Sequence, residues 1–134
     1  MRERVPLKGS EFYLPPETFR MVKHFCYSYA EMKREALNMQ GLRSPAMDGM
    51  PRGSGVSNPT ERDGMRLAEL GRKIRIIEDA VLATAPDEYK WLFANVTDRR
   101  KPWSVLHDRY GCKIGRNRMG RMRREVYWRV SREI

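Results

Sequence analysis

Two long segments of this 134-residue chain carry apolar residues at alternating steps of three and four, and this periodicity constrains the fold more than any other feature. Such spacing places side chains on one face of an α-helix. In the segment 18–39 the residues on these steps are Val22, Phe25, Tyr29, Met32, Ala36 and Met39. In the segment that follows Pro59 they are Leu67, Leu70, Ile74, Ile77 and Val81. We therefore predict two amphipathic helices whose apolar faces are buried in a core.

The residues between these two helices have a different composition. Gly, Pro and Ser dominate residues 40–58 and the periodicity disappears there, which is typical of a long loop. Its PRGSGVS sequence resembles a phosphate-binding loop but has neither Walker nor dinucleotide-binding spacing, so we favour a connector. The NPTE sequence at 58–61 then offers a capping residue, a first-turn proline and an acid, which favour a helix start. We predict an antiparallel helical hairpin over residues 15–85, preceded by a flexible leader at 1–14.

Residues 86–134 are predicted to contain two shorter helices and one longer helix. Pro86 and Pro102 each suit a first helical turn, and Gly111 suits a helix end. The expected packing residues are Tyr89, Leu92 or Trp91, Phe93 and Val96 in the first helix, and Trp103, Leu106 and Tyr110 in the second. The stripe of the last helix is Met119, Met122, Val126 and Val130, joined by Tyr127 or Trp128. A short helix, a glycine turn and a longer basic helix follow the order of a helix-turn-helix. The fold is therefore predicted to be all-α, with the hairpin followed by a C-terminal helix-turn-helix.

The length of the turn after Gly111 decides which side chains of the last helix face outward. With the usual turn, Asn117 falls where a core aliphatic residue is expected. Placing Met119 there instead requires a turn about two residues longer. The sequence leaves these two alternatives open.

The positive charge of the chain is concentrated near its C-terminus. The whole sequence carries a net charge of +10, and residues 98–134 account for +8 of it, with twelve Lys or Arg and four Asp or Glu. Such asymmetry is typical of a segment that contacts a polyanion, most often nucleic acid. We therefore expect double-stranded DNA as the partner of the C-terminal region.

The N-terminal turns of the second helix of a helix-turn-helix enter the major groove. The residues expected on that face are Arg116, Asn117, Gly120, Arg121 and Arg124. Arg pairs bidentately with guanine and Asn with adenine, while glycine allows close approach of the backbone. Phosphate contacts are expected from Arg99, Arg100, Lys101, Arg109 and Lys113, of which the last can also reach a base from the turn.

Four segments, taken in their order along the chain, carry a resemblance to one known family. They are 13-YLPPETFRMV-22, PRGSGVSNPTER, MRLAELGRKIRIIEDAV and LHDRYGCKIGRNRMGRMRREVYW. From about residue 12 onward the chain resembles the phage-encoded late transcriptional regulators of the RinA/ArpU type. The resemblance implies a helix-turn-helix similar to region four of bacterial sigma factors, and promoter binding beside host RNA polymerase. It also implies that Arg116, Asn117 and Arg118 begin the recognition helix, with Arg123 and Arg124 further along. On this basis Arg118 is expected at a base and Arg123 at a phosphate.

Other functions fit the sequence less well. A small-terminase-like DNA-packaging protein is the main alternative, since such proteins also join helical hairpins to a helix-turn-helix. An RNA-binding protein would need exposed aromatic side chains beside the basic face, and Tyr127 and Trp128 are closer to the buried stripe. An enzyme is not expected because no cluster of acid, base or nucleophile accompanies the two histidines. We expect a monomer or homodimer.

Cofactors, metals and membranes are not expected either. Neither His24 with Cys26 nor His107 with Cys112 has the paired spacing of a zinc site. No apolar run approaches the ~20 residues of a membrane span, and the N-terminal sequence lacks an apolar signal core. The cytoplasm of a bacterial host is the expected location.

Overall fold

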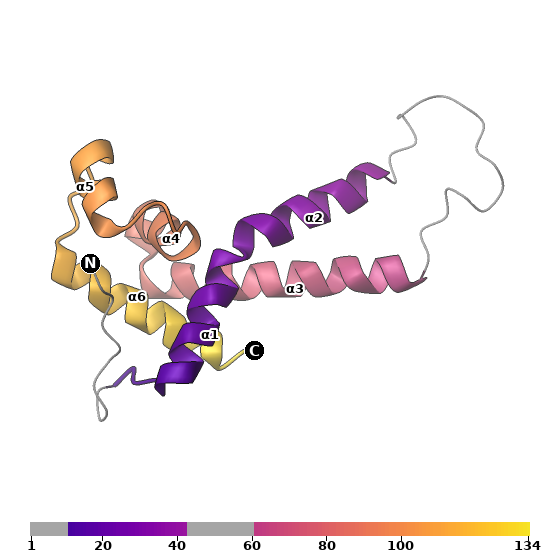
Figure 1. The fold of residues 1–134 in the computed structure, drawn as a ribbon, viewed down its shortest axis with the longest axis horizontal. Coiled ribbons are helices and arrows are strands. Elements are labelled where there is room, and N and C mark those ends of the chain that lie inside the picture. The colour runs from indigo at the N-terminus through magenta and orange to yellow at the C-terminus, as the bar shows by residue number, and fades with distance from the viewer. Residues whose placement is uncertain (1–10, 43–60) are drawn as a thin grey trace.

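The computed structural model describes residues 11–42 and 61–134, and all regular structure in these residues is helical (Figure 1). The predicted all-α fold class is therefore confirmed. The elements are α1 (Pro16–Tyr27), α2 (Tyr29–Leu42), α3 (Glu61–Thr84), the 3-10 helix η2 (Pro86–Glu88), α4 (Tyr89–Thr97), α5 (Trp103–Tyr110) and α6 (Arg116–Ser131). Residues 1–10 of the predicted leader at 1–14 and residues 43–58 of the predicted loop at 40–58 lie outside the described residues. The loop prediction is wrong for residues 40–42, which are helical and end α2.

The segment 18–39, predicted as one helix, is two helices that meet at Ser28. The N–H of Ser28 donates to the carbonyls of His24 and Phe25 at 3.0 and 3.1 Å, and its Oγ donates to the Phe25 carbonyl at 2.5 Å. A serine hydroxyl that bonds to nearby backbone competes with the regular helical pattern, which explains the break at this residue. The apolar stripe continues across it, with Val22 and Met32 both buried.

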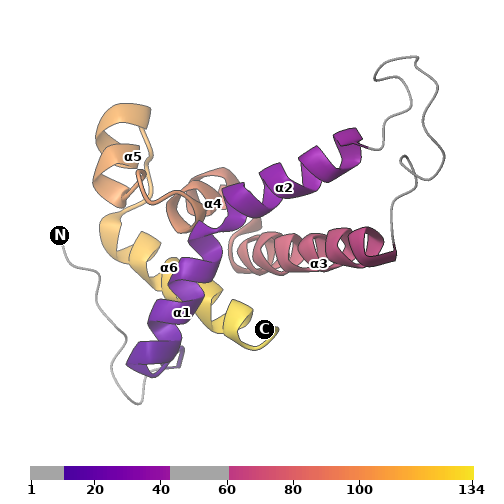
Figure 2. The same cartoon turned by 45° about the vertical axis from the view of Figure 1, so that its right-hand side comes forward.

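Helices α2 and α3 lie side by side and run in opposite directions (Figures 1 and 2). Leu70, Ile74, Ile77 and Val81 are buried on α3, as their spacing predicts. Polar contacts between described residues also join the helices. The Arg66 guanidinium binds both carboxylate oxygens of Glu35 at 3.0 Å, and the Tyr29 hydroxyl donates to Glu78 at 2.5 Å.

Helix α6 packs against α1, α3 and α4, so the described residues share one apolar core. The predicted stripe of Met119, Met122, Val126 and Val130 is buried, which confirms that part of the prediction. Tyr127 joins the stripe, with its ring edge-on to Phe19 at 5.3 Å. The regions 15–85 and 86–134, separated in the sequence-based division, therefore do not have separate cores.

Helix α5 lies at the opposite end of the molecule from the tips of α2 and α3 (Figure 2). Gly111 ends α5 with a φ of 75°, a backbone conformation that disfavours other residues, and the Cys112 N–H donates to the Leu106 carbonyl at 3.0 Å. Within the described residues, no helix combines the length and apolar character that crossing a membrane requires.

Candidate nucleic-acid interface

The connection between α5 and α6 is held by Trp103. Its indole N–H donates to the Ile114 carbonyl at 2.8 Å. Its ring stacks on the His107 ring with 4.7 Å between centroids, and the Arg116 guanidinium lies 5.7 Å from the Trp103 ring centroid. Cys112 and Ile114, which belong to this connection, are buried. Thus the start of α6 is fixed to α5 by packing and by one hydrogen bond.

The structure decides between the two alternatives for turn length. Five residues, 111–115, separate α5 from α6. Met119 is 1% exposed whereas Asn117 is exposed, so the longer turn is the one adopted. Gly115 adopts extended backbone immediately before the first residue of α6.

The outward face of α6 is a second stripe, made of Asn117, Arg121, Arg124 and Trp128 at steps of four, three and four. Asn117 and Arg121 are exposed and Arg124 is half-buried. Trp128 is covered on one side by Phe12, with 5.4 Å between ring centroids. The stripe is therefore most accessible over the N-terminal half of the helix.

Helix α6 contains six arginines but a single acid, Glu125. Glu125 binds Arg129 at 2.9 Å, one turn later in the same helix. Arg118 pairs with Glu88, and Arg123 donates to groups in α1 and α4. The other three arginines, within the described part of the chain, form no ion pair; they are Arg116, Arg121 and Arg124. All three lie within the first nine of the sixteen residues of α6.

Arg123, predicted at a phosphate, is placed elsewhere by the structure. Its Nη1 donates to the Asn95 carbonyl and side-chain oxygen at 2.6 and 2.7 Å, and its Nη2 donates to the Tyr27 hydroxyl at 2.8 Å. The guanidinium also lies 5.1 Å from the Tyr127 ring. The spacing contained this information, because Arg123 follows Met119 by four residues and so lies on the buried stripe. We therefore exclude Arg123 from the candidate interface.

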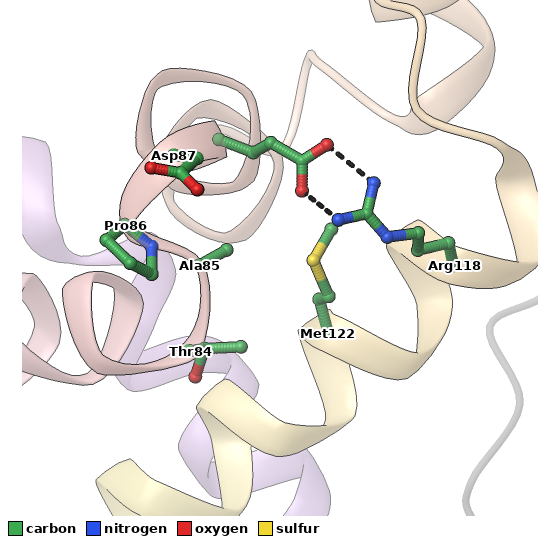
Figure 3. Close-up of a pocket in the computed structure, with 7 residues that line it drawn as sticks. Thr84, Ala85, Pro86, Asp87, Arg118 and Met122 are labelled. Carbon is green, nitrogen blue, oxygen red and sulfur yellow. Dashed lines mark hydrogen bonds and ion pairs between the residues drawn. The ribbon is translucent and has the colours of Figure 1, made fainter.

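Arg118, predicted at a base, lies on the flank of α6 that faces η2. Both of its Nη atoms donate to the Glu88 carboxylate, and this pairing raises the pKa of the guanidinium. The pair forms one wall of an open pocket of about 370 Å³ between η2 and α6 (Figure 3). Met122 lies four residues after Arg118 and lines the same pocket. Arg118 is thus separated from the outward stripe.

Three of the predicted phosphate contacts come together at the link between α4 and α5. Arg100, Lys101 and Arg109 line a hollow of about 480 Å³ that also includes Asp98, Val105 and Tyr110. Burial tends to raise the pKa of Asp98, but the backbone N–H and the guanidinium of Arg100 outweigh it and lower that pKa. The other two predicted contacts lie outside this hollow. Arg99 lies over the Tyr27 ring at 4.8 Å, and Lys113 is exposed in the turn.

Tyr110 was expected to pack and is instead 55% exposed, so that prediction is wrong. Gly111 ends α5 directly after it, which leaves the tyrosine at the helix end without a following turn to cover it. The Lys101 ammonium lies 5.2 Å from its ring. The site residues predicted from the sequence included neither Tyr110 nor Asn95. For Tyr110 the one indication in the sequence was Gly111, which marks the end of the helix next to it.

Gly120 has room for a side chain in this structure. A Cβ built there would lie 3.5 Å from the Arg124 Nη1, an ordinary van der Waals contact. The fold of the described residues therefore does not itself require glycine at this position.

The described residues hold no cluster of three or more His, Cys, Asp or Glu side chains with the geometry to bind a metal ion. Comparison with protein families, with curated proteins and with solved structures found no match for this chain.

Proposed function

We propose that this protein binds double-stranded DNA through α5, the 111–115 turn and α6, which act as a helix-turn-helix. The observation that carries the proposal is the distribution of charge on α6. Its arginines without an ion pair in the described chain are Arg116, Arg121 and Arg124, and all three lie within its first nine residues. The N-terminal turns are the part of such a helix that enters a major groove. A solvated surface helix would instead place an acid one turn away from each arginine.

The outward stripe has the chemistry for reading bases. Arg121 and Arg124 can each donate two hydrogen bonds to guanine, and Asn117 can bond adenine through its amide. Gly120 lies beside them, where a missing side chain lets backbone approach the DNA. The helix macrodipole adds positive potential at the α6 N-terminus, where no side chain caps the helix.

The hollow at the α4–α5 link supports the phosphate part of the proposal. Arg100, Lys101 and Arg109 bring three cations to one concave surface, although Arg100 already contacts Asp98 at 3.3 Å. Cations that neutralise phosphates release counterions, which makes DNA affinity fall steeply with salt. Arg99 and Lys113 are further phosphate contacts in this proposal.

The cellular role we propose is regulation of transcription, with DNA recognition beside RNA polymerase. It rests on the resemblance to phage late regulators and on the separation of surfaces within the fold. The tips of α2 and α3 lie far from α5, so a second protein can contact them while α6 is on DNA (Figure 1). Binding, rather than catalysis, is the proposed activity.

Selection of duplexes from a random-sequence library tests the proposal, followed by footprinting on the selected sequence. We expect enrichment of one motif and discrete protection. Arg121→Ala and Arg124→Ala should each weaken binding by about 1–3 kcal/mol where the side chain reads a base. Arg109→Ala should instead weaken binding to all duplexes and lower the salt slope by about 1.

Arg72→Ala is the matched control, since it removes an exposed arginine from α3, which is not part of the proposed helix-turn-helix. It should leave DNA affinity unchanged. Equal weak binding to every duplex, with no enriched sequence, would reject sequence-specific recognition. Equal losses for Arg72→Ala and Arg121→Ala would mean that net charge alone explains the binding.

A further inference from the structure

We propose that Glu88 is a specificity-determining residue, which holds Arg118 away from DNA and so limits sequence-independent binding. This inference rests on the proposed function and adds to it a residue of η2, outside the helix-turn-helix. Without Glu88, Arg118 would join Arg116, Arg121 and Arg124 as a fourth arginine of α6 able to neutralise a phosphate.

The geometry favours a pair that persists in the unbound protein. Both Nη atoms of Arg118 donate to the two carboxylate oxygens of Glu88, an arrangement that adds directionality to charge attraction (Figure 3). The partners are 30 residues apart in sequence, so the contact depends on how η2 packs beside α6. The Glu88 side chain is 24% exposed and the Arg118 side chain 52% exposed. The carboxylate is therefore partly sheltered while the arginine stays within reach of solvent.

Anchoring α6 is not the role that this contact is suited to. Ion pairs at exposed positions contribute little to stability because water and salt screen them. The same end of α6 is already held by Met119, which is 1% exposed, and by Arg123 through its bonds to α4 and α1. Removing the Glu88 charge should therefore leave the helix in place.

The electrostatic effect of the pair is larger than its structural effect. A carboxylate that accepts both Nη atoms cancels the charge that Arg118 would present to a phosphate. The pair is therefore neutral overall, close to the N-terminal turns of α6, where DNA phosphates would lie. Loss of this positive charge opposes binding to any duplex, whatever its sequence, because phosphates carry no sequence information directly.

Glu88→Gln tests this inference, with Asp87→Asn as its matched control. Asp87 is the adjacent acid and lines the same pocket, but it makes no ion pair within the described residues. Both variants remove one negative charge, and only Glu88→Gln releases Arg118. We expect Glu88→Gln to bind a mixed-sequence duplex about two- to fivefold more tightly than Asp87→Asn does. Its salt slope should be steeper by about 0.9, the value for one additional phosphate contact.

Arg118→Gln supplies a second, independent measurement. Because Arg118 is withheld in the wild-type protein, Arg118→Gln alone should leave the salt slope unchanged, whereas Arg109→Gln, at a proposed phosphate contact, should lower it. The double variant Glu88→Gln/Arg118→Gln should lose the affinity gained by Glu88→Gln. Circular dichroism of each variant checks that α6 is retained. The ratio of affinities for the selected and the mixed duplex should fall in Glu88→Gln, because the added contact does not read sequence.

The outcomes separate this inference from the function on which it rests. If the wild-type protein binds DNA and Glu88→Gln behaves as Asp87→Asn does, the role assigned to Glu88 is wrong and the proposed function stands. A salt slope that falls in Arg118→Gln as much as in Arg109→Gln would also overturn it. If the wild-type protein binds no duplex, the proposed function and this inference both fail.

Discussion

Arg123 donates hydrogen bonds to both the backbone carbonyl and the side-chain oxygen of Asn95, at 2.6 and 2.7 Å. Asn95 is only 4% exposed and donates in turn to the Lys101 carbonyl at 3.2 Å. A chain of polar contacts therefore runs from α6 through α4 to Lys101, which lines the hollow at the α4–α5 link. In this way a half-buried arginine positions the two surfaces that we propose contact DNA.

Replacement of Arg123 should destabilise the fold. Arg123→Met keeps an unbranched apolar stem but removes the guanidinium, which leaves the buried Asn95 oxygen without its donor. We expect a loss of about 1–3 kcal/mol in the free energy of unfolding, measured by urea denaturation. Arg121→Met, on the exposed face, should change it by less than about 0.5 kcal/mol. Equal stability of the two variants would show that the Arg123 contacts contribute nothing to folding.

Substitution of Gly120 should change stability and DNA affinity in opposite directions. Gly120→Ala should stabilise the protein by up to about 1 kcal/mol, since alanine favours helix and its Cβ meets no obstacle. The same methyl should weaken DNA binding where backbone and DNA approach closely. Gly71→Ala on α3 is the control, with its Cβ 3.3 Å from the mobile end of Arg75. It should leave DNA affinity unaltered, and unchanged affinity in Gly120→Ala would mean that no close approach occurs there.

The two glycines of the turn should differ in their tolerance of a side chain. Gly111 has a φ of 75°, so Gly111→Ala should lower the unfolding free energy by about 1–2 kcal/mol. Gly115 has a φ of −69° and open space around its Cβ position, so Gly115→Ala should be close to neutral. Thermal unfolding of both variants checks the difference. A neutral Gly111→Ala would indicate that the turn relaxes without cost.

Tyr29 should make stability depend on alkaline pH. Burial first, and then its hydrogen bond and proximity to Glu78, raise the pKa of Tyr29 above the usual value of about 10. Above that pH the unfolded chain loses this proton while the folded protein retains it. The contribution is therefore complete below pH ~10 and is lost as pH rises further.

The variant Tyr29→Phe removes this contribution. Its free energy of unfolding should fall less steeply than that of the wild-type protein above pH ~10 in urea titrations. Tyr110→Phe, at a ring that is 55% exposed, should follow the wild-type curve. Parallel curves for Tyr29→Phe and the wild-type protein would contradict the proposed linkage.

The solution mass separates regulation from DNA packaging. Native mass spectrometry of the full chain should find a monomer or a homodimer. Leu37 and Met65, which are 57% and 69% exposed on α2 and α3, are apolar positions at which copies can meet. A closed ring of many copies would instead favour the terminase-like alternative.

Local sequence patterns determined the helical elements of this protein. The stripe from Met119 to Val130, the end of α5 at Gly111 and the start of α6 after Gly115 all follow from rules that act over a few residues. The break at Ser28 was not predicted, because the apolar stripe continues across it. Periodicity shows which face of a helix is apolar and does not show where a helix ends. The exposure of Tyr110 was not predicted for a related reason, because its spacing from Trp103 and Leu106 is that of a packing residue.

Only the tertiary structure decided what each arginine of α6 does. Arg118 meets a carboxylate 30 residues away, and Arg123 meets a hydroxyl 96 residues away. Whether a guanidinium finds such a partner depends on how distant helices pack, and no local pattern contains that information. The sequence by itself therefore determined a basic amphipathic helix near the C-terminus. The packing of α1, η2 and α4 around it determined which of its charges remain at the surface to meet a partner.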